Sequence, residues 1–375
     1  ALKQPEPTYP LRVLFCRRCH LAQLGDIVDP SLLFRHYFYH SSGMPASAHF
    51  RTYASAVVRD FITGPNQLVV EIGSNDGHFL AVVKDLGARV LGVDPAQNLA
   101  AIARTRGVPT FPDFFSAALA RQIVAEHGTA KVVIANNVVA HINDHHDLMA
   151  GVSTLLAPDG VFIIEAPYLV DMFENLTYDT IYHEHLSYLS LRPLQTFLTA
   201  FGRSIFNAEL YPVQGVSFRA FICRPGAWPV NPAVELLMAR ERSLHLDRQD
   251  AYLHLAQRIA ASRDRLSQRL HQLKSIGKRI AAYGAPAKGN TVLNYANIGT
   301  DLLDYAHEDL PAKVGWYTPG MHVRIVDRQY SHGHLPDYFL LLAWNYREGI
   351  LTKEEAFRAN GGRFIIPVGD KIPVV

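Results

Sequence analysis

The sequence predicts an α/β protein with a mostly parallel sheet covered by helices on both faces, followed by a second, smaller α/β domain. The first observation is that short β-branched runs alternate with helical stretches between residues 67 and 167, as in repeated βαβ units. The second is that these runs are apolar throughout, which is typical of strands buried on both faces. The third is a new strand, glycine loop and helix within residues 278–296.

The first domain is expected to alternate strand and helix up to residue 167. Its segments are 67–73, 77–87, 89–94, 95–107, 131–139, 145–160 and 161–167. Beyond them, 194–202 predicts a helix, and 207–213 and 216–223 predict two strands that could add an antiparallel edge. Residues 233–278 predict a connecting helix or helix pair, since they lack the sustained heptads of a coiled coil. Residues 336–368 predict strand, helix and strand.

The expected domain organisation follows from the length of the chain and from a cluster of proline and glycine residues. A chain of 375 residues exceeds one ordinary core, so two or three units are expected. Three prolines and a glycine between residues 225 and 232 mark the main break. We expect an N-terminal module over 1–50, a cofactor-binding core over 51–225, and a linker helix with a C-terminal α/β domain over 226–375.

Composition excludes several classes of protein. With 49% hydrophobic and 19% charged residues, the chain is neither disordered nor fibrous. The net charge of +2 gives no polyanion-binding field, so nucleic acid is not an expected partner. The longest apolar runs, such as 339–344, are too short to span a membrane. The first ten residues show no secretory signal, so we expect a cytoplasmic protein, as a monomer or small homo-oligomer.

A glycine turn after the first strand is the strongest local motif. Gly73 and Gly77 let the backbone approach a ligand at the start of a helix. Glu71 and Asp94 end neighbouring strands, and Asp94 can accept bonds from ribose hydroxyls. Because acids surround the glycines, the turn suits a positively charged sulfonium better than a pyrophosphate. It therefore predicts S-adenosylmethionine, against the alternative of a purely structural turn. Asp113 and Phe114 could lie at the adenine, although such a cluster often only ends an element.

Histidines gather at two places. His141 follows a strand, at the edge of the sheet where ligands collect. The denser cluster is Tyr182, His183, Glu184 and His185. If it is extended, alternate residues share a face, whereas a tight turn could bring all four together. Zinc is disfavoured here because the spacing lacks two histidines four residues apart on a helix. General acid and base chemistry fits better, and a polar loop without catalysis is the remaining alternative.

Cys16 and Cys19 could supply two of the four ligands that a structural zinc ion requires. Either a partner pair precedes residue 1, or His20 or His36 substitutes, or no metal binds. Zinc is therefore a cofactor only if the site is completed.

In the second domain, a loop of small residues over 283–291 joins a strand to a helix. The N-terminus of the helix attracts anions and Lys288 adds a positive charge, so a diphosphate is the expected ligand. Asn294, Trp344 and Asn345 could add contacts, although each is more often part of a turn or a core.

Six blocks together resemble a known family: EIGSNDG, NNVVAHI, YDTIYHEHLSYLS, YGAPAKGNT, TPG and AWN. Over essentially the whole chain, the sequence is similar to the deoxysugar C-methyltransferases of antibiotic and surface-polysaccharide pathways. The resemblance implies a Rossmann-like class I methyltransferase core, a truncated N-terminal zinc module and a C-terminal domain that helps hold a nucleotide sugar. Cys16 and Cys19 match the second cysteine pair of that module, and the first pair has no counterpart here.

The resemblance also implies roles for individual residues: the catalytic set is Tyr182, Glu184, His185 and His141, and the segment with Tyr39 and Ser42 lies near the cofactor. Together with the residues of the motifs above, the expected cofactor set is Tyr39, Ser42, Glu71, Gly73, Asn75, Gly77, Asp94, Asp113, Phe114 and Asn136. The expected substrate set is Tyr283, Gly284, Ala285, Lys288, Asn290, Asn294, Trp344 and Asn345.

The expected reaction is methylation of sugar C3 beside a C4 ketone, through an enolate. His185 or Tyr182 is the candidate base, with Glu184 orienting or tuning it and His141 donating to the enolate oxygen. The alternatives are an O- or N-methyltransferase acting on a small metabolite, or a ligand-binding homologue without catalysis. A dehydrogenase is disfavoured because no acidic ribose partner clearly follows residues 283–291 at the usual spacing.

Overall fold

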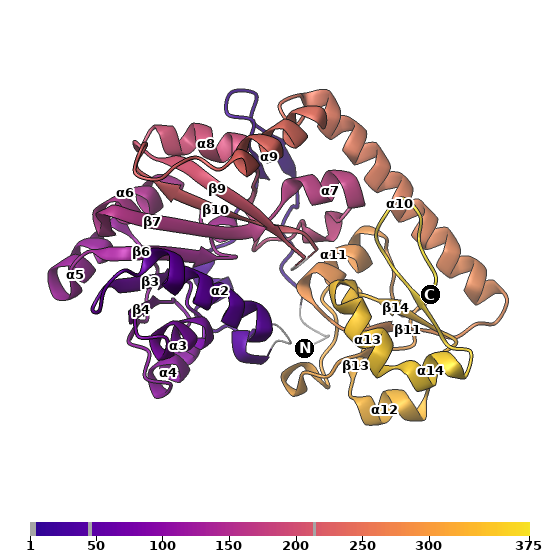
Figure 1. Ribbon diagram of the computed structural model, residues 1–375. Coiled ribbons are helices and arrows are strands. Elements are labelled where there is room, and N and C mark those ends of the chain that lie inside the picture. Colours follow the sequence, from indigo (N-terminus) through magenta and orange to yellow (C-terminus); the bar gives the residue numbers. More distant parts are fainter. Residues whose placement is uncertain (1–4, 44–46, 213–214) are drawn as a thin grey trace.

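The computed structural model describes residues 5–43, 47–212 and 215–375, which form three sheets (Figure 1). The largest has seven strands in the order β5-β4-β3-β6-β7-β10-β9. Its first five strands are parallel, and β10 runs antiparallel to both of its neighbours, β7 and β9, so these two strands add antiparallel pairing at the edge, as the sequence predicts. The bounds are β3 Leu68–Ile72, β4 Arg89–Val93, β5 Thr110–Phe111, β6 Ala130–Asn136, β7 Leu156–Pro167, β9 Ser204–Tyr211 and β10 Ser217–Cys223.

Helices cover both faces of this sheet because neighbouring strand residues point to opposite sides. Val69 and Val132 belong to one buried cluster, with α2 and α3, whereas Val70 and Val133 belong to another, with α5 and α6. Such two-sided burial explains why the strands read as continuously apolar. The helices are α2 Ser47–Phe61, α3 His78–Asp85, α4 Gln97–Thr105, α5 Ala117–His127, α6 His145–Leu155, α7 Leu169–Asn175 and α8 Leu191–Thr199.

The connecting segment is a helix pair, α9 Pro232–Ser243 and α10 Gln249–Ser275, which leads to a five-stranded parallel sheet. Its order is β13-β12-β11-β14-β15, so the second α/β unit is also present. The strands are β11 Ile280–Tyr283, β12 Ala306–His307, β13 Ile325–Val326, β14 Tyr338–Leu341 and β15 Arg363–Ile365. The helices are α11 Ala287–Tyr295, α12 Arg328–Gly333, α13 Arg347–Lys353 and α14 Glu355–Ala359.

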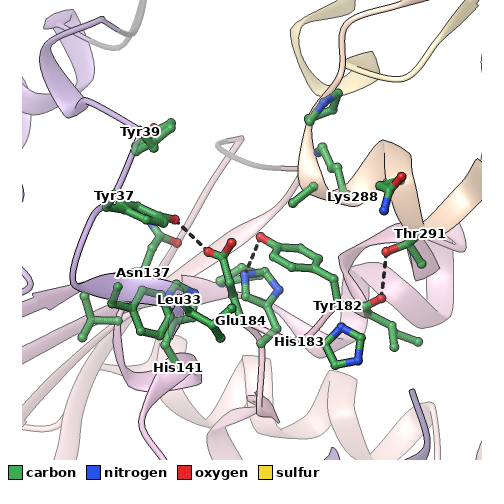
Figure 2. Close-up of a pocket in the computed structure, with 18 of the residues that line it drawn as sticks. Leu33, Tyr37, Tyr39, Asn137, His141, Tyr182, His183, Glu184, Lys288 and Thr291 are labelled. Carbon is green, nitrogen blue, oxygen red and sulfur yellow. Dashed lines mark hydrogen bonds between the residues drawn. The ribbon is translucent and has the colours of Figure 1, made fainter. Parts of the chain in front are cut away.

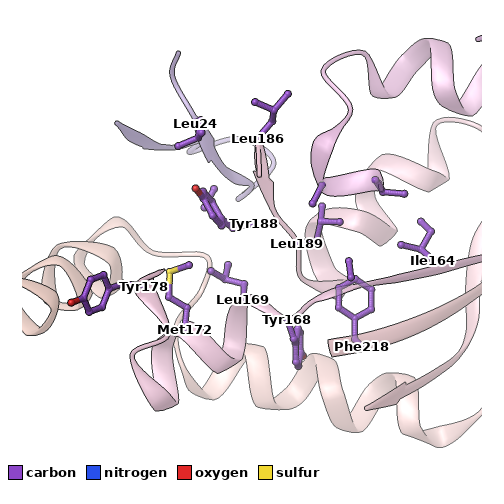
Figure 3. Close-up of a cluster of buried hydrophobic side chains, with 14 of the residues drawn as sticks. Leu24, Ile164, Tyr168, Leu169, Met172, Tyr178, Leu186, Tyr188, Leu189 and Phe218 are labelled. Carbon is purple, nitrogen blue, oxygen red and sulfur yellow. The ribbon is translucent and has the colours of Figure 1, made fainter. Parts of the chain in front are cut away.

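The N-terminal module joins the core through a three-stranded sheet. Strands β1 Val13–Phe15 and β2 Ala22–Leu24 pair with β8 Ser187–Tyr188, and α1 Pro30–Phe34 follows them. Leu24, Leu186 and Tyr188 belong to the same buried cluster as Leu169 and Met172 of α7 (Figure 3). This packing positions residues 177–186, which precede β8.

Several elements were not predicted from the sequence: in the core these are α2, β5, α5, α7 and β8, in the N-terminal module β1, β2 and α1, and in the second domain β12, β13 and α12. Strand β5 has two residues and α7 has seven, so neither carries enough residues to show a period. Short 3₁₀ turns complete the fold: Ser41–Gly43, Val139–His141, Tyr178–Thr180, Pro311–Lys313 and Trp344–Tyr346. In the described parts of the chain, no helix has both the length and the apolar character to cross a membrane.

Candidate active site

One cavity of about 2520 Å³ lies where the loops of all three sheets meet. It is lined by the glycine turn after β3, the 182–185 cluster and the loops after β11 and β12. Parallel strands place their carboxyl ends at one edge, which is why these loops converge. The predicted catalytic residues and most predicted cofactor and substrate residues therefore face a common space.

The glycine turn after β3 is built around Asn75. Its backbone N–H donates to Asp94 at 2.7 Å, and the N–H of Ala96 donates to the other Asp94 oxygen at 2.8 Å. Gly73 has φ +70°, and a Cβ there would lie 2.2 Å from the side chain of Val138. Only glycine fits this position. Gly77, at φ +73°, likewise begins α3 where a Cβ would lie 2.9 Å from Ala103.

A strap over residues 35–43 covers this turn. The Asn75 side chain donates to the Tyr39 carbonyl at 3.0 Å and accepts from the Ser41 N–H at 2.9 Å. The Ser42 hydroxyl donates to buried Asp76 at 2.5 Å. The predicted residues Tyr39 and Ser42 thus contact the turn itself, through backbone and hydroxyl groups.

The turn fits a cofactor that carries hydrogen-bond donors and positive charge. Asn136 donates to one oxygen of Glu71 at 2.9 Å. The other Glu71 oxygen and the Asn136 carbonyl oxygen are buried and have no hydrogen-bond partner among the described residues. Buried acceptors are normally satisfied, so both are available to an ammonium or hydroxyl of a ligand. Burial, with repulsion from Asp94, raises the pKa of Glu71 to about 8 against the opposing bond from Asn136.

Asp113 and Phe114 lie at the rim. Phe114 lines the cavity under the guanidinium of Arg35, whose central carbon is 4.8 Å from the ring centroid. The Asp113 side chain is largely exposed and pairs with Arg35 at 3.3 Å. The aromatic face of Phe114 is therefore placed for a flat ligand group. The carboxylate of Asp113 instead holds Arg35 at the start of the strap.

The Tyr182–His185 segment forms a tight turn, in which the N–H of His185 donates to the carbonyl of Tyr182 at 2.9 Å. The side chains of Tyr182 and Glu184 lie close together at the cavity (Figure 2), and the Tyr182 hydroxyl lies 3.0 Å from Nε2 of His185. His183 contacts the backbone carbonyl of Tyr9 at 3.2 Å instead, so it joins the N-terminal module to the turn.

The hydrogen bonds of His185 determine its tautomer. Nδ1 lies 2.9 Å from the Thr180 carbonyl oxygen, which can only accept, so Nδ1 carries the proton. Nε2 is then an acceptor, and it lies 3.0 Å from the Tyr182 hydroxyl, which donates to it. Burial lowers the pKa of His185 to about 4, and burial raises the pKa of Tyr182 well above 10. Near neutral pH the pair is therefore a phenol donating to a neutral imidazole.

Glu184 makes a contact that the sequence did not indicate. We expected Glu184 to orient the base, but its side chain accepts a hydrogen bond from Tyr37 of the strap at 2.7 Å. Tyr37 is thus a site residue that sequence reasoning missed, and no motif around it could have identified it. Burial raises the pKa of Glu184, and its charge contributes to the raised pKa of Tyr182.

His141 lies between two rings. Its ring stacks on Phe34 at 5.6 Å and on His185 at 5.1 Å between centroids. Burial lowers its pKa well below 6.5, so its ring is neutral and can donate one hydrogen bond into the cavity. The four predicted catalytic residues are accordingly within one cluster.

The predicted substrate residues of the second domain divide into two groups. Gly284, Ala285, Lys288, Asn290 and Asn345 line the cavity beside the catalytic turn, and the Thr291 hydroxyl of α11 donates to the Ile181 carbonyl at 3.0 Å (Figure 2). The other three have their polar side-chain atoms in use: Tyr283 donates to Glu354 at 2.9 Å, Trp344 donates to Asp179 at 2.6 Å, and Asn294 holds the Pro319 turn at 3.1 Å. Tyr283 and Asn294 still line the cavity, whereas Trp344 does not and lies against Lys288 instead.

The two cysteines lie in the turn after β1. Donation from the backbone N–H groups of Cys19 and Arg18 lowers the pKa of Cys16. Within the described residues, no third histidine, cysteine or acid joins Cys16 and Cys19, so neither His20 nor His36 completes a zinc site. Two thiols alone do not fit a structural zinc ion.

Comparison with known proteins agrees with the site. Residues 47–205 match the family model "Methyltransferase domain", 212–369 match "C-methyltransferase C-terminal domain", and 1–34 match "Putative zinc binding domain". The chain is 39% identical over 365 residues to the C-methyltransferase NovU of Streptomyces niveus, covering 97% of this chain and 87% of that protein.

Two solved structures overlap about half of the chain. One is magnesium protoporphyrin IX methyltransferase from Synechocystis, with 17% identity, TM-score 0.35, and coverage of 48% of this chain and 79% of that one. The other is a methyltransferase from Anabaena variabilis, with 14% identity, TM-score 0.37, and coverage of 46% and 84%.

The strand order, the glycine turn and the methyltransferase-domain match define the class: an S-adenosylmethionine-dependent methyltransferase with a Rossmann-like core. Within that class, the chain belongs to the C-methyltransferase family. This confirms the resemblance that its sequence motifs indicate.

Proposed function

We propose that this enzyme methylates C3 of a 4-keto-deoxysugar linked to a nucleoside diphosphate, through an enolate. The observation that carries the proposal is the Tyr182–His185 hydrogen bond, which faces the cavity shared by the glycine turn and the loop after β11. Methylation of carbon requires a base that removes the C–H proton, and a phenol bonded to a neutral imidazole can be that base. Methylation of a hydroxyl or an amine proceeds without an enolate. Residues 51–225 would hold the cofactor, and residues 226–375 would hold the nucleotide.

The acidic side chains around the glycine turn would bind the cofactor. Glu71 and Asn136 offer acceptors to the ammonium group, Asp94 offers its remaining lone pairs to ribose hydroxyls, and Phe114 offers a face to adenine. Bound S-adenosylmethionine supplies an electrophilic methyl group on a positively charged sulfur. The strap, through Tyr39 and Ser42, would close this part of the cavity against water.

Cofactor binding should release a proton from Glu71. Because the pKa of Glu71 is about 8, its carboxyl is mostly protonated at pH 7, and a positive ligand beside it favours the ionised form. Affinity should therefore rise as pH is raised from 6 to 8. Titration calorimetry at pH 7 in buffers of different ionisation enthalpy measures the release. The Glu71→Gln variant should release fewer protons, and equal release by both proteins would contradict this assignment.

The chain's own residues would remove the C3 proton. The Tyr182 oxygen takes the proton from carbon while its own proton passes to Nε2 of His185, and the C–H electron pair becomes the enolate. The Thr180 carbonyl, already bonded to Nδ1–H, stabilises the imidazolium that forms. The neutral ring of His141 donates to the enolate oxygen.

Tyr37 and Glu184 would act through Tyr182. The Glu184 carboxylate, held by the Tyr37 hydroxyl, keeps a negative charge near the phenol. This charge opposes a lasting phenolate, so the phenol takes up the carbon's proton as its own proton passes to His185. We therefore assign Glu184 and Tyr37 a positioning and tuning part.

The diphosphate would lie against α11. The Lys288 side chain is 8% exposed, and its Nζ has no hydrogen-bond partner among the described residues. It lies 4.7 Å over the Trp344 ring and faces the same cavity as His185. Burial lowers the pKa of Lys288, against the opposing charges of Asp179 and Asp171, and an anion bound beside it at the helix start would favour its charged form.

Solvent exchange tests the enolate. With a thymidine-diphosphate 4-keto-deoxysugar in deuterated water and no cofactor, the enzyme should replace the C3 proton by deuterium, which proton NMR records. Tyr182→Phe should slow this exchange. Retention of the C3 proton by the wild type, or a product methyl that is removed by cleavage of methyl ethers, would contradict the proposal.

A further inference from the structure

The second domain contains a crevice that repeats the geometry of the cofactor crevice. In the order β13-β12-β11-β14-β15, strand β12 lies on one side of β11 and β14 on the other, so the chain reverses direction across the sheet at β11. In open parallel sheets, ligands bind at the carboxyl ends of the strands beside such a reversal. The loops after β11 and β12 meet there and line the cavity.

The hydrogen bonds at the two crevices correspond. In the first, Gly73 N–H donates to the Val93 carbonyl at 2.7 Å, and Asn75 N–H donates to Asp94. In the second, Gly284 N–H donates to the His307 carbonyl at 2.8 Å, and Ala285 N–H donates to Glu308 at 3.0 Å. Each acid directly follows the strand next to the glycine loop.

This correspondence corrects an expectation from the sequence. We expected no clear acidic ribose partner after residues 283–291. Glu308 stands 24 positions after Gly284 (308 − 284 = 24), and the parallel pairing of Tyr283 with His307 brings it beside the loop. The acid was not evident because β12 has only two residues and shows no strand pattern.

Glu308 has one acceptor position left. Its Oε1 accepts from the N–H groups of Asp309 and Leu310 at 3.0 and 3.1 Å, and its Oε2 accepts from Ala285. A carboxylate offers about four acceptor positions. Its side chain is 15% exposed and lines the cavity, and Lys313 Nζ lies 3.6 Å from Oε2 and holds the charge in place.

Two further groups that a nucleotide needs line the cavity together with Glu308. Lys288 has no hydrogen-bond partner among the described residues, and its charge contributes to the lowered pKa of His185, so it lies near the catalytic turn. Trp316 is exposed, and its backbone N–H donates to the carbonyl of Lys313, whose ammonium pairs with Glu308. An anion site, an acid and an aromatic ring are the groups that a diphosphate, a pentose and a base would each contact.

We propose that Glu308 binds a pentose hydroxyl of the substrate's nucleoside, with the diphosphate at Lys288 and the base beside Trp316. This rests on the proposed function and adds the orientation of the nucleotide. Glu308 is then a specificity residue for the nucleoside half, remote from the reacting carbon.

A double-mutant-type cycle, which combines a substitution of Glu308 with removal of the ligand's 3′-hydroxyl, tests the contact between them. Affinities of wild type and Glu308→Gln are measured by calorimetry for thymidine diphosphate and for its 3′-deoxy analogue, which lacks the hydroxyl. Loss of the hydroxyl should weaken wild-type binding about 10- to 100-fold and leave the variant nearly unchanged. Inorganic pyrophosphate should bind both proteins alike. Asp304→Asn, which removes a charge near the opposite end of β12, is the matched control and should behave as wild type.

The outcomes separate two failures. If the wild type binds neither thymidine diphosphate nor pyrophosphate, the proposed function fails and takes this inference with it. If it binds both, but the hydroxyl matters equally in wild type and variant, the inference alone is overturned. If the variant also loses pyrophosphate, Glu308 holds the loop, and the inference is likewise overturned.

Discussion

Replacing Tyr182 by phenylalanine is expected to lower turnover by about 10²- to 10⁴-fold, as loss of a proton-transfer group does. The substitution removes only the hydroxyl that donates to His185 at 3.0 Å, so cofactor affinity should stay near the wild-type value. His185→Asn should have a comparable effect because it removes the acceptor. Labelled-methyl transfer measures turnover, and calorimetry measures cofactor affinity.

A matched control and a pH profile make this prediction specific. Tyr188→Phe removes another hydroxyl on the cavity wall, one without a described partner, and should have little effect on turnover. Because the pKa of His185 is about 4, the ring is a free acceptor above pH 5 and is protonated only as pH falls toward 4. His185 should therefore produce no inflection near pH 6.5. Wild-type turnover in Tyr182→Phe would refute the relay.

Replacing Arg219 by alanine is expected to lower the free energy of unfolding by about 3–5 kcal/mol, the usual cost of removing one partner of a buried ion pair. Among the described residues, Glu165 then keeps only its contact with His49, whose Nε2 lies 3.4 Å from Oε1. Arg219 and Glu165 pair between β10 and β7 at 2.5 Å, and both side chains are 2% exposed. The guanidinium carbon also lies 3.3 Å from the Tyr53 ring centroid and 4.0 Å from that of Tyr211. Denaturant unfolding monitored by circular dichroism measures the change.

Two further variants distinguish charge burial from packing. Replacing both Arg219 and Glu165 with apolar residues of similar size should recover much of the loss, because no buried charge is then left alone. Arg248→Ala breaks an exposed pair with Asp250 and should leave unfolding unchanged. A double variant as unstable as Arg219→Ala would show that the aromatic contacts dominate.

Much of the fold was predictable because its signals are local. The alternation of apolar strands and periodic helices located β3, β4, β6 and β7, and the helix pair after residue 231 was expected from its spacing. Most of the missed strands have two or three residues, where few positions carry a pattern, whereas the longer helices α2 and α5 were missed although they have 15 and 11 residues. The C-terminal sheet was only partly expected, since β12 and β13 have two residues each.

The candidate site divides in the same way. Glu71, Asp94 and His141 were expected because they lie at the carboxyl ends of β3, β4 and β6 or in the turn that follows, and the ends of parallel strands meet. Tyr37 and Glu308 were not expected, since their partners lie 147 and 23 positions away along the chain. Contacts between segments so far apart, or across an unrecognised strand, leave no period in the sequence.

Sequence alone determined the class of reaction and the types of side chain available, because functional motifs and the hydrophobic patterns of buried strands are formed by residues that are close together in the sequence. Tertiary structure alone decided how those side chains are paired: which nitrogen of His185 is free, that Glu184 accepts from Tyr37, and that Glu308 faces the substrate cavity. The physical reason is that a hydrogen bond depends on distances of about 3 Å and on the direction of lone pairs. Those quantities are established only when distant segments pack together.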